Sequence, residues 1–111
     1  MSASKFHCGG MDAREVLDVI VAQGANLTNP REAVFYFYGA EEKLPELQTD
    51  LERLGFFVHS TKTEPGRIAR MNTVVDEAWL GEMMPNLCAI VSDHGVEYDG
   101  WEASIPEGHK E

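Results

Sequence analysis

The chain has 111 residues, of which 43% are hydrophobic and 25% charged, values that are typical of one globular domain and exclude wholesale disorder. Nine lysine and arginine residues against nineteen aspartate and glutamate residues give a formal net charge of −10. Because nucleic acids and anionic membranes are bound largely through cations, this charge argues against direct binding to either and favours a basic protein surface as partner. The acidity can equally serve solubility alone.

The N-terminus and the cysteines predict a cytoplasmic protein without a membrane span. Residues 1–10 lack the apolar segment of a secretory signal, and the longest apolar run, residues 33–38, is far shorter than the ~20 residues that cross a bilayer. Cys8 and Cys88 are too few and too far apart for a secreted disulfide scaffold. We interpret Cys88, which falls within an apolar helical pattern, as a buried structural thiol.

The first half of the chain predicts a flexible tail over residues 1–10, then a helix, a strand and a second helix. Residues 12–23 carry apolar side chains at helical spacing and are followed by a glycine. Residues 33–38 combine β-branched and aromatic side chains, which is typical of a strand. Residues 44–54 place four leucines at spacings of three, four and three, which predicts an amphipathic helix.

The second half predicts a hairpin, a helix and a last strand. Residues 56–63 and 67–73 are strand candidates on either side of a Pro-Gly turn signal. Residues 76–93 have a helical pattern that Pro85 should kink or split. Its apolar face is expected to carry Trp79, Met83, Leu87, Ile90 and Val91. Residues 98–105 complete the set as a short strand.

This order of elements predicts an α+β fold class. Right-handed crossovers and a central hairpin favour a ferredoxin-like split βαβ sandwich, with a βαββαβ core preceded by an extra N-terminal helix. We expect one domain over residues 11–106, between flexible tails at residues 1–10 and 107–111.

Strand alternation predicts a second, polar and aromatic face of the sheet. If Phe35, Phe37 and Trp101 face the helices, the other face carries the candidate partner-binding residues Tyr36, Tyr38, Tyr98 and Glu102. Depending on register, the candidate His59 and also Arg70 could join them. We expect this face to be covered by the N-terminal helix, by a second subunit in a homodimer, or by a partner. The rival hypothesis is a small ligand-binding domain or enzyme with a pocket between this face and the N-terminal helix.

The remaining motifs predict no catalytic residue, no metal and no cofactor, so we do not expect an enzyme. His7 and Cys8 are adjacent, but further ligands at usable spacing are missing, and the chain has neither a CxxC nor an HExxH motif. The glycines form neither GxGxxG nor a P-loop.

The segment Tyr98-Asp99-Gly100-Trp101-Glu102, which follows a predicted helix and a glycine, resembles the C-terminal signature of the bacterial RraB family, regulators of ribonuclease E activity. Three further features are similar to that family: residues 26–31 leading into the aromatic strand, the junction over residues 54–58, and the closing helix from Asp76. The resemblance covers residues 11–105. It implies a ferredoxin-like domain that binds ribonuclease E, inhibits its cleavage of RNA and so modulates RNA decay.

The resemblance also suggests roles for the residues of the signature. We interpret Trp101 as a core residue of the last strand and Gly100 as the site of a bulge or of a close backbone approach. Asp99 and Glu102 would contact a basic partner or solvate an edge of the sheet.

Overall fold

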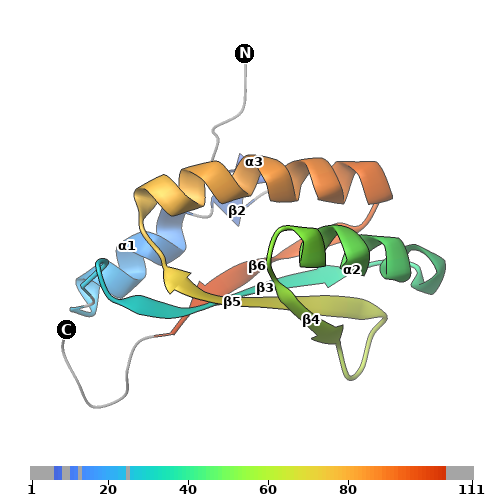
Figure 1. Cartoon of the computed structure of the whole chain (residues 1–111), viewed down its shortest axis with the longest axis horizontal. Coiled ribbons are helices and arrows are strands. Elements are labelled where there is room, and N and C mark those ends of the chain that lie inside the picture. The colour runs from blue at the N-terminus through green and yellow to red at the C-terminus, as the bar shows by residue number, and fades with distance from the viewer. Residues whose placement is uncertain (1–6, 9–10, 13, 25, 105–111) are drawn as a thin grey trace.

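The computed structural model describes residues 7–8, 11–12, 14–24 and 26–104, and its core is a four-stranded antiparallel sheet (Figure 1). The core elements are β3 (Pro30–Tyr38), the 3-10 turn η1 (Glu41–Lys43), α2 (Leu44–Arg53), β4 (Phe57–Ser60), β5 (Gly66–Val74), α3 (Glu77–His94) and β6 (Glu97–Ala103). The strand order is β4-β5-β3-β6, with α2 and α3 on the same side of the sheet (Figure 1). This arrangement confirms the predicted α+β, ferredoxin-like fold class.

The segment before the core lies with the helical layer. It comprises β1 (His7–Cys8), β2 (Met11–Asp12) and α1 (Arg14–Ala22). The strand β1 lies against α3, and α1 contacts both α3 and β6. Leu17 and Ile20 of α1 are buried in the same core cluster as the helix-facing side of the sheet. The predicted tails at residues 1–6, 9–10 and 107–111, and the last residues of the domain at 105–106, lie outside the described residues.

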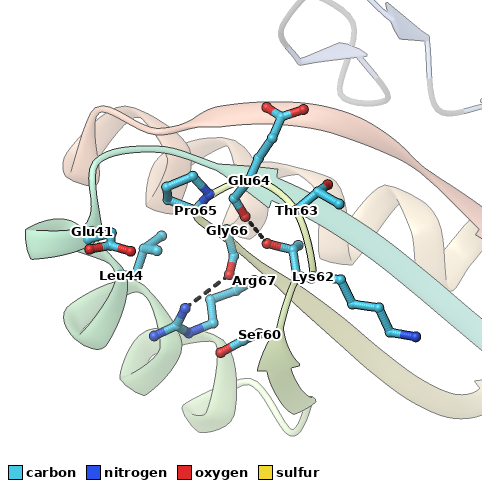
Figure 2. A pocket seen from close by; sticks show the side chains of 10 residues that line it. Glu41, Leu44, Ser60, Lys62, Thr63, Glu64, Pro65, Gly66 and Arg67 are labelled. Carbon is cyan, nitrogen blue, oxygen red and sulfur yellow. Dashed lines mark hydrogen bonds between the residues drawn. The ribbon is translucent and has the colours of Figure 1, made fainter.

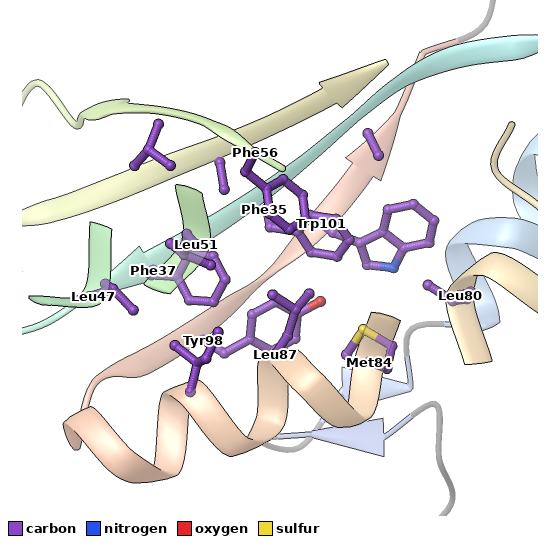
Figure 3. Packing of buried hydrophobic residues seen from close by; sticks show 14 of the residues in the cluster. Phe35, Phe37, Leu47, Leu51, Phe56, Leu80, Met84, Leu87, Tyr98 and Trp101 are labelled. Atoms are coloured by element: carbon purple, nitrogen blue, oxygen red, sulfur yellow. The ribbon is translucent and has the colours of Figure 1, made fainter. Parts of the chain in front are cut away.

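The core fills the space between the sheet and the helices (Figure 3). Phe35 of β3 stacks on Trp101 of β6 at 5.3 Å between ring centroids, and Phe56 meets Phe35 edge-on at 5.6 Å. Side chains of this kind each contribute roughly 1.5–3 kcal/mol on burial. Helices α2 and α3 supply the fully buried residues Leu47, Leu51, Leu80, Met84 and Leu87.

Helix α3 is continuous from Glu77 to His94, so of the two effects predicted for Pro85, a kink or a split, the split is wrong. The Asp76 carboxylate caps the helix by accepting from the Trp79 amide at 2.9 Å. Pro85 is exposed, so water can solvate the Gly81 carbonyl that lacks a helical donor. Leu87 and Ile90 of the predicted apolar face are buried, but in the first half of the helix the buried residues are Leu80 and Met84, while the predicted Trp79 and Met83 are only partly buried.

Cys88 is disulfide-bonded and half-buried on α3, so its interpretation as a free structural thiol is wrong. A sequence with two cysteines this far apart gives no spacing signal for a bond. The disulfide-bonded Cys88 belongs to α3, the helix that β1 contacts.

A β-bulge in β6 corrects the predicted position of Tyr98. The β3–β6 register shifts between Tyr36 and Phe37, which pair with Gly100 and Tyr98, so Asp99 is the extra residue. Gly100 has a φ of 113°, a conformation that favours glycine, and the predicted bulge is confirmed. Tyr98 is therefore turned to the helical side, where it is 7% exposed and packs beside Phe37 (Figure 3).

Candidate functional site

We call the side of the sheet that faces away from α2 and α3 the open face. Strand alternation and register assign its side chains, because residues opposite one another in neighbouring strands share a face. The members are Glu32, Val34, Tyr36 and Tyr38 of β3, Phe57 and His59 of β4, Gly66, Ile68, Arg70, Asn72 and Val74 of β5, and Glu97, Gly100 and Glu102 of β6. Because α1 packs with the helical layer, the predicted pocket between the open face and the N-terminal helix is absent from the described part of the chain.

Polar side chains on the open face hold one another in a fixed network. The Arg70 Nη1 donates to Glu32 Oε1 at 2.9 Å, and the Arg70 Nε donates to His59 Nε2 at 2.8 Å. The other ring nitrogen of His59, Nδ1, lies 3.3 Å from the Ser60 carbonyl oxygen. These two bonds link side chains of β4, β5 and β3 across the open face.

A second hydrogen-bonded pair on the open face joins β3 to β6. The Tyr36 hydroxyl donates to Glu102 Oε1 at 2.6 Å. This bond to the carboxylate, then burial and the Glu102 charge, raise the pKa of Tyr36 to about 12. The neutral phenol is therefore the form that the open face stabilises.

The open face also carries exposed apolar surface. Phe57 is 73% exposed, and its ring centroid lies 6.5 Å from that of His59. Val74, the last residue of β5, is also exposed. Phe57 belongs to β4, a strand of four residues at the edge of the sheet. A large aromatic side chain left in water at a sheet edge is typical of an interaction surface.

The fold brings together most of the residues that the sequence nominated. Tyr36, Tyr38, His59 and Glu102 share the open face, and Arg70 joins them as the register allowed. Asp99 is exposed at the bulge. Tyr98 does not belong to this site: burial raises the pKa of its phenol, and its hydroxyl has no hydrogen-bond partner among the described residues.

Sequence reasoning missed Phe57 and Glu32. A signal for Phe57 exists in the adjacent pair Phe56 and Phe57, because neighbouring residues of a strand point to opposite faces and only one can enter the core. Phe56 is buried and Phe57 is not. Glu32 gave no signal before the register of β3 against β5 was known.

The segment at residues 26–31 that resembled the family signature has a structural role. The Asn26 Oδ1 accepts from the amide of Thr28 at 3.0 Å and from its hydroxyl at 2.7 Å. The buried Arg31 donates to the carbonyls of Asn26 at 2.8 Å and of Ser104 at 3.0 Å. These bonds fix the entry to β3 against the end of β6, and thereby hold the register of the open face.

A hollow of about 460 Å³ lies beside the β4–β5 turn (Figure 2). Its lining mixes cations, carboxylates and hydroxyls from the hairpin and from the start of α2: Glu41, Leu44, Ser60, Thr61, Lys62, Thr63, Glu64, Pro65, Gly66 and Arg67. The Thr61 hydroxyl donates to the Glu64 carbonyl, and Arg67 is held by Gln48 at 2.8 Å. Neither histidine nor cysteine lies in this lining to activate a hydroxyl.

Over the described ranges, histidine, cysteine and carboxylate side chains form no group of three that could hold a metal ion. Within the same part of the chain, each helix is too short or too polar to span a bilayer.

Residues 11–103 match the protein family described as Regulator of ribonuclease activity B. A comparison with curated proteins finds no match. The matched range contains the complete βαββαβ core, the open face and the segment from Tyr98 to Glu102 that carried the resemblance. The family is one of regulators rather than catalysts, which supports a regulatory role. The chain therefore belongs to the Regulator of ribonuclease activity B family.

Proposed function

We propose that this protein binds ribonuclease E through its open face and inhibits the cleavage of RNA, acting in the cytoplasm without catalysis of its own. Membership of a family of ribonuclease regulators supports the identity of the partner. The observation that carries the choice of surface is Phe57, which is 73% exposed on the face that α1, α2 and α3 leave uncovered.

The composition of the open face suits a protein partner. Aromatic side chains are enriched at the centres of interfaces, where they bury a large area at a small entropic cost. Three such side chains lie on two strands that are separated only by β5: Phe57 on β4, and Tyr36 and Tyr38 on β3. The network around Arg70 is formed in the free protein, so binding immobilises few additional side chains.

Charge supports a basic partner surface. An enzyme that holds RNA needs cations along the path of the phosphates. A chain with a net charge of −10 is attracted to such a surface and can compete there with RNA, because complementary charge raises the rate of encounter. The attraction should weaken as salt screens it.

Cleavage of a model RNA by ribonuclease E tests the proposal, with and without this protein, at roughly 50 and 200 mM salt. We expect inhibition that is stronger at the lower salt concentration, with no affinity of the protein for the RNA alone. Poly-glutamate at an equal concentration of charge is the matched control, and it should inhibit far less because it has no folded face. Full cleavage at both salt concentrations, or equal inhibition by poly-glutamate, would contradict the proposal.

A further inference from the structure

The open face contains a small hollow of about 180 Å³ over the central strand. It is lined by residues of the three strands β3, β5 and β6 and by the residue after β6: Glu32, Val34, Arg70, Glu102, Ala103 and Ser104. It is separate from the hollow at the β4–β5 turn, with which it shares no lining residue.

The floor of this hollow is apolar and its walls are charged. Val34 forms the floor, and its direct neighbours across the sheet are Arg70 on β5 and Glu102 on β6. Val34 is only 4% exposed although it points away from the helices, because the long side chains on both sides cover it. An apolar floor between charged walls suits a guest with an aliphatic stem and a charged head.

The charges of the hollow select a cation. Glu32 and Glu102 contribute two carboxylates and Arg70 one guanidinium, which leaves one net negative charge. The bonds to Arg70 and Tyr36 both engage Oε1, and a carboxylate can accept further bonds at its second oxygen. The guanidinium of Arg70 is neutralised by Glu32 and fixed by His59, so it need not move to admit a guest.

We propose that this hollow receives an arginine side chain of the protein partner, an inference that rests on the proposed docking of a basic partner on the open face. A guanidinium has five N–H donors in one plane and can reach carboxylates on two strands. It is also more weakly hydrated than the ammonium of lysine, so less free energy is lost when it leaves water. An anionic guest is disfavoured by the charge of the hollow and of the whole chain.

The first arm of the test uses a small probe and does not need the partner. Nα-acetyl-arginine methylamide is titrated into the isotopically labelled protein, and amide chemical shifts are followed at low salt. We expect saturable shifts centred on Val34, Arg70 and Glu102, and weaker shifts with the lysine counterpart. Glu102→Gln should abolish them. Glu97→Gln, the same charge change on the same strand but outside the hollow, should retain them.

The second arm measures the affinity of ribonuclease E for the same variants. Glu102→Gln should weaken binding by about tenfold, the value of one charge-assisted hydrogen bond, and Glu97→Gln by a smaller factor. Equal losses for the two variants, or equal shifts with the arginine and lysine probes, would overturn the arginine site. If the wild-type protein does not bind ribonuclease E, the proposed function fails, and the probe titration still decides whether the hollow takes arginine.

Discussion

The two faces of the sheet use similar residues for different purposes. On the covered face, Phe35 and Trp101 stack inside a core with almost no exposure to water. On the open face, no helix of the described residues packs over Tyr36 and Phe57, and Phe57 is largely exposed. The same strands carry both sets, because successive residues alternate between the faces.

This difference separates stability from function within one small domain. Apolar burial on the covered face supplies most of the free energy of folding, since the helices pack only there. The open face is organised by hydrogen bonds and ion pairs between half-exposed side chains, which contribute little to stability. Its residues are therefore available to a partner.

The largest expected effect is on the covered face. Phe35→Ala should lower the free energy of unfolding by about 3–5 kcal/mol, because it removes a fully buried ring and leaves a cavity. Phe57→Ala should change it by no more than about 0.5 kcal/mol, as is usual for exposed positions. Urea unfolding measures both values. Similar losses for the two variants would contradict the division between the faces.

At the bulge in β6, the alternation of side chains between the two faces of the sheet is reversed. Gly100→Ala should lower the free energy of unfolding by roughly 1–3 kcal/mol, because alanine is strained at a φ of 113°. The strain should also disturb the inward position of Tyr98, which an amide hydrogen exchange measurement across β6 would detect. Unchanged unfolding and unchanged exchange would show that the bulge does not depend on glycine.

Polar side-chain pairs should also contribute more to stability on the helical side of the sheet than on the open face. Asp50 of α2 contacts His94 of α3 at 2.7 Å, and the His94 side chain is only 12% exposed. Asp50→Asn should cost about 1 kcal/mol, because it weakens the bond to a nearly buried ring. Glu32→Gln on the open face should cost at most about 0.5 kcal/mol. Thermal unfolding of the two variants under identical conditions checks the order, and a larger loss for Glu32→Gln would reverse it.

The last effect concerns the stability of the protein at high pH, through Tyr36. The pKa of Tyr36 is about 12 in the folded protein against about 10 in the unfolded chain, because it donates to Glu102. A pKa that is raised by folding contributes stability below pH ~10, and this contribution is lost as the pH rises through about 12. Tyr36→Phe should remove this part of the pH dependence.

The pKa values of Tyr36 on the open face and Tyr98 on the covered face are raised by different causes. Glu102→Gln should lower the pKa of Tyr36, measured by tyrosinate absorbance, and should leave the pKa of Tyr98 unchanged, because Tyr98 is raised by burial alone. A parallel shift of both tyrosines would mean that the variant loosens the whole sheet.

Much of the fold could be predicted because local patterns and tertiary packing agree. The leucine spacing from Leu44 to Leu51 predicts the buried stripe of α2, and the alternation of Phe35 and Tyr36 assigns the faces of β3. Such periodicities survive because one side of each element must be apolar.

The remaining features depend on contacts between distant segments. Tyr98 was assigned to the wrong face because one extra residue at Asp99 reverses the alternation before it, and only pairing with β3 reveals a bulge. The pairing of Arg70 with Glu32 likewise depends on the β3–β5 register. The bond at Cys88 was missed because neither cysteine has a spacing that indicates one.

The open face as the binding surface is tested most directly by two exposed apolar residues in different layers. Phe57 lies on the open face, and Val19 of α1, which is 52% exposed, lies with the helical layer. The dissociation constant for ribonuclease E should be measured with Phe57→Ser and Val19→Ser, both of which keep the net charge. The account predicts a loss of at least about tenfold for Phe57→Ser, as for an interface anchor, and almost none for Val19→Ser. Equal affinities for Phe57→Ser and the wild type, or a loss confined to Val19→Ser, would contradict it.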